Sequence, residues 1–236
     1  MIKAIIFDKD GTLFALGNMW DKPTEWAYRK LLKQSQLNPD QQEAFMLHMG
    51  IDQGKMVPNS LSAAGSIQDQ AEEFNKILPL STKEISQMLE DNFLTYISQH
   101  PEAFVLMPGL EATLETLAKD YYLGLVTNDN YRLAQQALET TGLAKYFRFV
   151  GCADQYAPKP NPAALEALAQ KEGFAFDEMV YVGDSALDMT YGRLTKAAIG
   201  FAEQESYRTF LKEADYLIDH MEQLPALIDQ INREQD

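Results

Sequence analysis

The first thirteen residues constrain the fold of this chain more than any other stretch. An apolar run rich in β-branched residues, Ile2 to Phe7, predicts a buried strand. The run stops at Asp8 and Asp10, and Gly11 follows at once. Because residues two apart in extended backbone point the same way, both carboxylates should leave the carboxyl end of the strand together. Open α/β sheets bind their ligands at that edge.

Two carboxylates that converge in this way repel each other unless a cation lies beside them. Mg²⁺ is the expected cation, since it binds one or two carboxylates together with phosphate oxygens of a substrate. Gly11 allows a ligand to approach the backbone closely, and exposed amides there could hold an anion. The pattern therefore predicts phosphate chemistry. The alternative is an acidic turn at a strand end, because Asp and Gly are common turn residues.

Composition narrows the range of partners. The chain has 236 residues, with 20 basic against 35 acidic side chains and a net charge of −15. Such a surface repels nucleic acid and anionic membranes, so neither is an expected partner. The apolar run before the first acid, Asp8, is shorter than a signal peptide requires, and we expect none. No apolar run is long enough to span a bilayer. The single cysteine, Cys152, cannot form an internal disulfide, which fits a reducing compartment. We expect a cytoplasmic protein, and the sequence indicates no oligomeric state.

The rest of the chain has two regions of different pattern. From about Phe14 to Phe104 the pattern is helical, with a loop-like stretch from Gly50 to Gly65 and no convincing strand. After Met107-Pro108-Gly109, helices alternate with strands, which predicts right-handed crossovers and a parallel sheet. The predicted strands are Tyr122–Val126, Phe147–Val150, Met179–Val182, Ala198–Phe201 and Tyr216–Ile218.

We therefore predict an α/β fold with a Rossmann-like parallel sheet core and an inserted all-helical cap domain. The core is discontinuous, comprising residues 1–14 and 106–236, and the cap comprises residues 15–105. The chain crosses between the two parts near Phe14 to Gly17 and near Val105 to Gly109, and we expect these crossings to act as hinges.

Polar residues occur where other apolar runs stop. Thr127 and Asn128 follow one predicted strand and offer groups suited to phosphate oxygens. Lys159 lies in a loop stiffened by three prolines. Asp184 and Asp188 bracket the start of a helix, and their spacing of four puts them on one helical face. Each taken alone could be a strand-end cap, a solvated charge or a helix N-cap, but together they fall on one edge of the sheet.

At these residues the chain resembles the haloacid dehalogenase-like (HAD) superfamily of hydrolases. The resemblance covers the whole chain, since members of this superfamily often insert a helical cap after the first motif. The position of the cap is most similar to the phosphoglycolate phosphatase and β-phosphoglucomutase branch. The four motifs are Phe7-Asp8-Lys9-Asp10-Gly11-Thr12-Leu13, Val126-Thr127-Asn128, Lys159-Pro160, and Val182-Gly183-Asp184-Ser185 with Asp188.

The resemblance implies a role for each acid at the first motif. Asp8 would be the nucleophile, and Asp10 the general acid and base. The metal ligands would be the carboxylate of Asp8, the backbone carbonyl of Asp10 and Asp184. The residue types support this reaction, because a carboxylate can attack phosphorus and a second acid can transfer the protons.

The resemblance also implies a phosphate-binding set. Thr127 and Lys159 would hold the phosphoryl group, and we add Asn128 and Gly11 as further phosphate-binding candidates. Asp188 would orient Lys159 or a metal-bound water.

The function that follows is a Mg²⁺-dependent phosphatase that hydrolyses a small phosphorylated metabolite through an aspartyl-phosphate. Its substrate would be phosphoglycolate-like or a sugar phosphate. The alternatives are a phosphosugar mutase of the β-phosphoglucomutase type and a non-catalytic phosphometabolite-binding protein. Cap residues would select the substrate, and Trp20 is the best candidate among them. By strand alternation Lys9 should point away from both acids and be structural.

Overall fold

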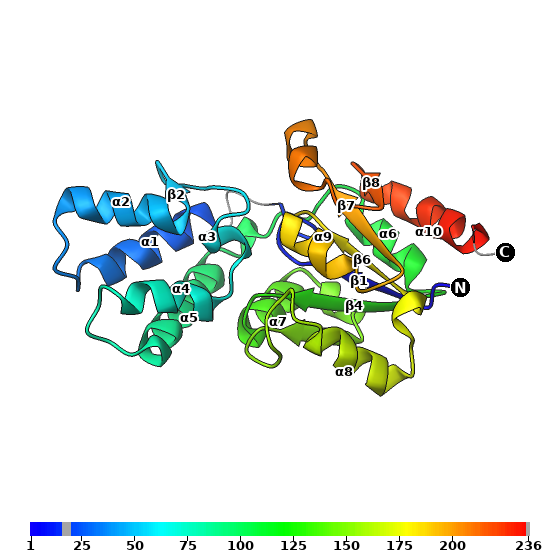
Figure 1. Cartoon of the computed structure of the whole chain (residues 1–236), viewed down its shortest axis with the longest axis horizontal. Coiled ribbons are helices and arrows are strands. Elements are labelled where there is room, and N and C mark those ends of the chain that lie inside the picture. Colours follow the sequence, from blue (N-terminus) through cyan, green and yellow to red (C-terminus); the bar gives the residue numbers. More distant parts are fainter. Residues whose placement is uncertain (16–19, 235–236) are drawn as a thin grey trace.

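The structure is a computed structural model that describes residues 1–15 and 20–234. Its centre is a six-stranded sheet in the order β5-β4-β1-β6-β7-β8, and every pair of neighbours is parallel (Figure 1). The strands are β1 (Ala4–Phe7), β4 (Tyr122–Thr127), β5 (Phe149–Cys152), β6 (Met179–Gly183), β7 (Ala197–Phe201) and β8 (Tyr216–Ile218). The predicted α/β fold is confirmed, and most predicted strand ends lie within two residues of the observed ones.

The sheet is buried on both faces, which is why its strands are continuous apolar runs. All four residues of β1 are buried. Ile5 and Phe7 pack with α6, α7 and α10 in one cluster, whereas Ala4 and Ile6 pack with α8 and α9 in another. The core helices are α6 (Leu110–Leu117), α7 (Tyr131–Thr140), α8 (Ala163–Glu172), α9 (Ala186–Gly192) and α10 (Leu224–Arg233).

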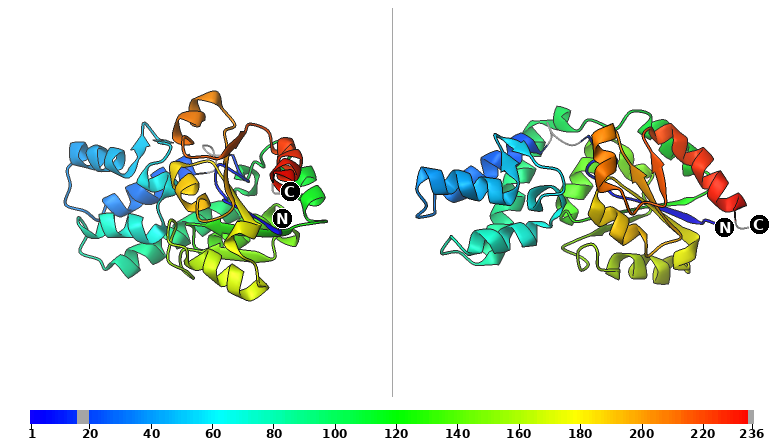
Figure 2. Two further views of the ribbon diagram at one scale, coloured as in Figure 1. Left: turned by 45° about the vertical axis from the view of Figure 1, so that its right-hand side comes forward. Right: turned by 45° about the horizontal axis from the view of Figure 1, so that its top comes forward.

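The segment between β1 and α6 forms a separate layer beside the carboxyl ends of the strands (Figures 1 and 2). Capping boxes at Asn38 and Ser81 begin α2 and α5. The expectation of a loop from Gly50 to Gly65 is partly wrong, because this stretch contains a small hairpin and a short helix. The elements of this segment are α1 (Asp21–Leu32), α2 (Pro39–Met49), β2 (Ile51–Asp52), β3 (Lys55–Met56), α3 (Leu61–Ala64), α4 (Ile67–Asn75) and α5 (Thr82–Gln99).

The two chain crossings lie side by side. Phe14 pairs with Leu106 in an antiparallel bridge, and the amide of Ala15 donates to the carbonyl of Val105 at 2.9 Å. The first predicted hinge extends to Gly17, which lies outside the described residues. Among the helices of residues 1–15 and 20–234, none is long and apolar enough to cross a membrane.

Candidate functional site

The strand register brings the acids of two motifs together. Phe7, the last residue of β1, is paired with Val182 of β6, so the residues that follow these strands emerge at the same edge of the sheet. Asp8 is 7% exposed and its amide donates to the carbonyl of Val182 at 2.8 Å. Asp184 follows β6 directly. The predicted convergence of Asp8 and Asp184 is what the backbone geometry produces.

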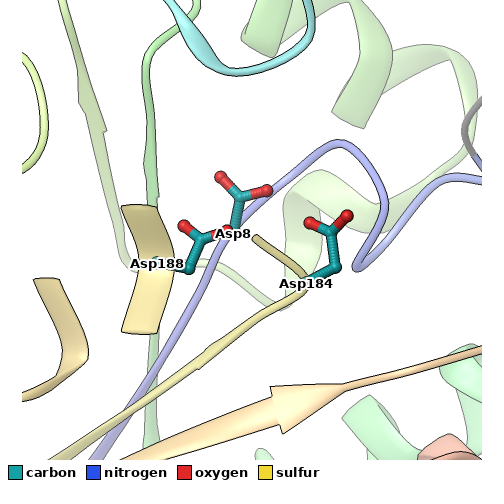
Figure 3. A group of neighbouring side chains, drawn as sticks. All are labelled: Asp8, Asp184 and Asp188. Atoms are coloured by element: carbon teal, nitrogen blue, oxygen red, sulfur yellow. The ribbon is translucent and has the colours of Figure 1, made fainter. Parts of the chain in front are cut away.

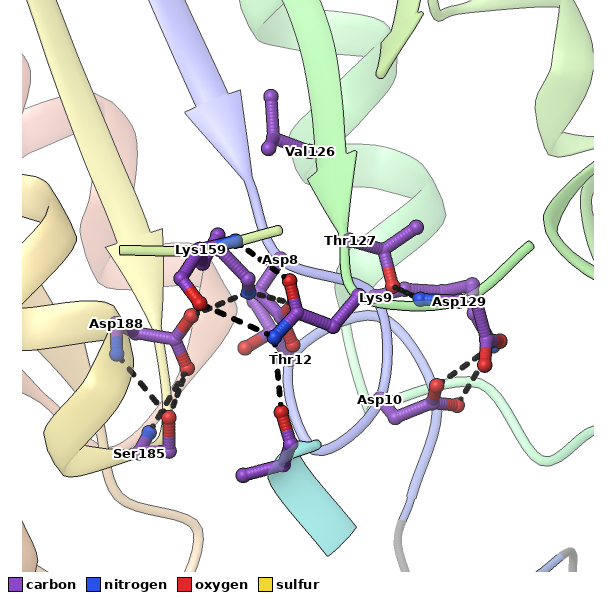
Figure 4. A network of polar contacts seen from close by, with 12 residues as sticks. Asp8, Lys9, Asp10, Thr12, Val126, Thr127, Asp129, Lys159, Ser185 and Asp188 are labelled. Atoms are coloured by element: carbon purple, nitrogen blue, oxygen red, sulfur yellow. Dashed lines mark hydrogen bonds and ion pairs between the residues drawn. The ribbon is translucent and has the colours of Figure 1, made fainter. Parts of the chain in front are cut away.

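Lys159 lies at the centre of this edge (Figure 4). Its ammonium is 2.6 Å from Oδ1 of Asp8 and 2.7 Å from Oδ1 of Asp188, and it also donates to the hydroxyl of Tyr181 at 3.0 Å. The side chain of Lys159 is only 5% exposed. A buried ammonium needs such partners, since an unpaired buried charge is costly. The lysine therefore links the end of β1 to the start of α9.

Both oxygens of Asp188 are used for contacts within the protein. Oδ1 receives Lys159 and lies 3.1 Å from the Tyr181 hydroxyl, while Oδ2 accepts from the hydroxyl and the amide of Ser185 at 2.6 and 3.0 Å. Ser185 also caps α9 by accepting from the Asp188 amide. This arrangement fits a residue that orients Lys159, the role expected of Asp188.

Asp184 keeps most of its carboxylate available. The hydroxyl of Thr12 lies 3.5 Å from its Oδ1, which is a weak contact. Gly11, at φ +82°, lies against this carboxylate, and a Cβ at that position would overlap the Asp184 side chain. The Gly11 amide donates to the carbonyl of Phe14 at 2.7 Å, so it is not free to hold a phosphate as expected from the sequence. Its requirement for glycine comes instead from the close approach to Asp184.

Burial and like charges shift the protonation of this cluster. Burial, with repulsion from Asp188, raises the pKa of Asp8 to about 7, although Lys159 opposes the change. Burial, followed by repulsion from Asp188 and Asp8, raises the pKa of Asp184 well above its ordinary value. For Lys159 burial alone would lower the pKa, but the carboxylates of Asp188 and Asp8 raise it overall. One lysine does not neutralise these acids, and a second cation would relieve the remaining repulsion.

The donor set suits Mg²⁺. One oxygen each of Asp8, Asp184 and Asp188 lies within 4.8 Å of the others, and Figure 3 shows the three carboxylates at the same edge of the sheet. Hard oxygen donors from one or two carboxylates, completed by water and phosphate, are what Mg²⁺ prefers. Because both oxygens of Asp188 are already engaged, Asp8 and Asp184 would be the direct carboxylate ligands.

Asp10 lies in a second, adjacent network. Its carboxylate accepts from the indole nitrogen of Trp20 at 2.7 Å and pairs with the Lys9 ammonium at 2.7 Å. Lys9 is fully buried and also pairs with Asp129 at 2.8 Å. The expectation that Lys9 points away from both acids is therefore wrong. Its ammonium is held between two carboxylates that line the same pocket as Asp8.

Thr127 and Asn128 lie where the sequence places them, at the end of β4. Both are buried and line the pocket, and the Thr127 hydroxyl accepts from the amide of Asp129 at 3.2 Å. Asn128 accepts from the Lys159 amide at 2.8 Å and donates to the carbonyl of Ala64, on the inserted segment, at 3.0 Å. Asn128 thus positions the lysine loop and contacts the helical layer.

Two residues of the site were missed by sequence reasoning. In the sequence, Tyr181 fits the apolar pattern of β6 and gives no sign of a polar role. In the structure its hydroxyl accepts from the Lys159 ammonium and donates to the carbonyl of Val126. Asp129 follows Asn128 directly, and its position as a further acid at a strand end could have marked it as a site candidate. Its pairing with Lys9 could not be read from the sequence, because it depends on the neighbouring strand.

Comparison with known proteins gives a consistent assignment. The haloacid dehalogenase-like hydrolase family matches residues 2–193. The phosphoglycolate phosphatase of Rhodospirillum rubrum is 32% identical over 194 residues, covering 80% of this chain and 74% of that protein. The phosphoglycolate phosphatase of Haemophilus influenzae Rd is 30% identical over 154 residues, covering 63% and 69%.

Solved structures share the fold. A predicted phosphoglycolate phosphatase from Haemophilus somnus 129PT superposes with a TM-score of 0.70 at 20% identity, covering 96% of this chain and 98% of that one. The β-phosphoglucomutase of Clostridium difficile also gives 0.70, at 18% identity and 99% coverage of both chains. The predicted resemblance to this branch is confirmed. The chain belongs to the haloacid dehalogenase-like hydrolase family.

Proposed function

We propose that this protein is a Mg²⁺-dependent phosphatase that hydrolyses a small phosphomonoester through an aspartyl-phosphate on Asp8. The observation that carries the proposal is the convergence of Asp8, Lys159 and Asp184 at one sheet edge, inside one pocket. The membership in a hydrolase family and the phosphoglycolate phosphatases among its relatives support the reaction type. Phosphoglycolate-like esters and sugar phosphates are the candidate substrates.

The first half-reaction transfers the phosphoryl group to the protein. A carboxylate oxygen of Asp8 attacks phosphorus, the bond from phosphorus to the ester oxygen breaks, and Asp10 donates a proton to the departing alcohol. The Lys159 ammonium, 2.6 Å from Asp8, offsets the negative charge of the transferring oxygens. Mg²⁺, held by the carboxylates of Asp8 and Asp184 with the Asp10 carbonyl, would supply further positive charge when bound.

The second half-reaction restores the enzyme. Asp10 takes a proton from a water molecule, whose oxygen attacks phosphorus, and the bond from phosphorus to Asp8 breaks to release inorganic phosphate. Thr127 and Asn128 would hold the phosphoryl oxygens on the β4 side. Asp188 keeps Lys159 in place in both halves through its contact at 2.7 Å.

The inserted layer has a proposed role as a cap over a core of residues 1–14 and 106–236. Two contacts support this role for residues 15–105. Asn128 of the core donates to the carbonyl of Ala64, and the amide of Ala186 in the core donates to Oδ1 of Asn59. A cap at this position would shield the phosphoenzyme from solvent.

A screen of phosphorylated metabolites, read by released phosphate, tests the proposal. Wild-type protein with Mg²⁺ should release phosphate from at least one small ester, and excess chelator should abolish the reaction. Asp8→Asn should abolish turnover with an unchanged circular dichroism spectrum, because the change is nearly isosteric. Asp10→Asn should lower the rate about 10²–10⁴-fold, as is typical of general acid–base catalysis. Full activity in chelator or in Asp8→Asn would contradict the mechanism.

The same screen separates the two alternative functions. A mutase would return the phosphoryl group to a sugar, so it would yield an isomeric sugar phosphate with little free phosphate. A phosphometabolite-binding protein would bind an ester without changing it.

A further inference from the structure

The pocket above Asp8 has a strongly unequal distribution of charge. On the core side it is lined by five carboxylates, and Lys159 is the one cation among its described lining residues. Lys159 is already paired with Asp8 and Asp188. It lies next to the proposed nucleophile and would hold the phosphoryl group. Lys9 lies behind the lining, fully buried, and is paired with Asp10 and Asp129. The proposed Mg²⁺ would be engaged by the phosphoryl group. Among the described lining residues, no further positive charge remains to receive a second anionic group of a substrate. The five acids are Asp8, Asp10, Asp129, Asp184 and Asp188.

The described residues of the inserted layer that line the pocket carry no charge. The apolar part of this wall includes Trp20 and Phe93, whose rings meet edge to face with centroids 5.4 Å apart, together with Met56 and Ile67. None of the lysines and arginines in residues 20–105 lines the pocket. The four residues between the described ranges, 16–19, are also uncharged by sequence.

The polar groups of this wall suit a neutral oxygen. Gln70 is 5% exposed, and its side-chain oxygen accepts from the hydroxyl of Tyr28 at 2.9 Å. That contact leaves the amide nitrogen as a donor, and no described residue accepts from it. Ser62 is occupied, because its hydroxyl donates to the carbonyl of Met49 at 2.6 Å. A hydroxyl of the substrate would satisfy the Gln70 donor, whereas a carboxylate would find no cation here.

We infer that the substrate is the phosphomonoester of an uncharged alcohol, with an apolar face that packs on Trp20 and Phe93 and an oxygen that accepts from Gln70. This inference rests on the proposed function and selects among its candidate substrates. It favours sugar-phosphate-like and other neutral esters over phosphoglycolate, whose carboxylate would face acids and an uncharged wall. Like-charge juxtaposition in a desolvated site is strongly unfavourable.

A matched pair of esters tests the inference. Phosphoglycolate and 2-hydroxyethyl phosphate differ only by a carboxylate in place of a hydroxymethyl group. With Mg²⁺ present, kcat/KM of the wild-type protein should be at least about tenfold higher for the neutral ester, since one buried like charge is removed. Dissociation constants for the non-hydrolysing variant Asp8→Asn, measured by calorimetry, should show the same order.

A variant pair checks the cause of the preference. Met56 is half-buried on the apolar wall. Met56→Lys adds a cation there and should shift the ratio toward phosphoglycolate, whereas the matched neutral variant Met56→Gln should leave the ratio near the wild-type value. Equal or tighter binding of phosphoglycolate by the wild-type pocket, or binding of neither ester, would overturn the inference. Binding of the neutral ester with no phosphate release from any ester would uphold the pocket preference and contradict the phosphatase proposal.

Discussion

Replacing Lys9 by methionine should destabilise the protein strongly. The Lys9 ammonium is fully buried and lies 2.7 Å from Asp10 and 2.8 Å from Asp129. It also lies 5.1 Å from the centroid of the Trp20 ring. Methionine fills a similar volume, so the main loss is the charge that neutralises two carboxylates.

The expected magnitude follows from the burial of the partners. Removing one partner of a buried ion pair costs about 3–5 kcal/mol, because the remaining charge is left uncompensated. The side chains of Asp10 and Asp129 are 17% and 18% exposed, so water can relieve part of that cost. We therefore expect the free energy of unfolding to fall by about 3 kcal/mol, the lower end of this range. For a chain of this size, that loss corresponds to a fall of about 6–12 °C in Tm.

Differential scanning calorimetry of the wild-type protein and of Lys9→Met measures this change. The matched control is Lys3→Met, since Lys3 is half-exposed and its ion pair with Glu178 lies at the surface, where such pairs contribute little. Adding Asp129→Asn to Lys9→Met should recover part of the loss by removing one unpaired charge. If Lys9→Met changed Tm no more than Lys3→Met does, the buried network of Lys9, Asp10 and Asp129 would not stabilise the fold.

Three further predictions concern the site and its surroundings. Gly11→Ala should weaken Mg²⁺ binding measured by calorimetry, because φ is +82° and a Cβ would displace Asp184; wild-type affinity would contradict the proposed ligand role. The affinity for Mg²⁺ should rise between about pH 5 and pH 8, because the pKa of Asp8 is raised to about 7 and Mg²⁺ must displace the Asp8 proton below that pH. A Mg²⁺ affinity that calorimetry finds constant over this pH range would contradict this. Cys152 should not react with a thiol reagent at pH 8 until the protein unfolds, because burial raises the pKa of its thiol; rapid labelling of native protein would contradict it.

Local patterns made the strands of the parallel sheet predictable. The apolar run before Asp8 depends on neighbouring residues only, and it forms β1 as expected. The hairpin of β2 and β3 was missed, although it has a local signal. Gln53 and Gly54 both have positive φ, at 48° and 76°, as a two-residue hairpin turn requires. Its strands are only two residues long, too short for any alternation to be read.

The contacts of Lys9 were not predictable in the same way. Strand alternation applies only while the backbone is extended, and β1 ends at Phe7. Beyond that point the chain turns, with Gly11 at positive φ, and the Lys9 side chain reaches Asp129 at the end of β4. Such a pairing depends on the order of strands in the sheet, and the sequence carries no local signal for it.

The most direct test of the account is the mass of the protein after rapid mixing with a substrate identified in the screen. The wild-type protein should be mixed with that ester and Mg²⁺, quenched in acid within one turnover, and digested. The aspartyl-phosphate mechanism predicts a peptide containing Asp8 that is heavier by one phosphoryl group, and no such peptide when the reaction is run in the presence of chelator. Turnover by the wild-type protein with no phosphorylated Asp8 peptide at any quench time, or with the phosphoryl group on another residue, would contradict it.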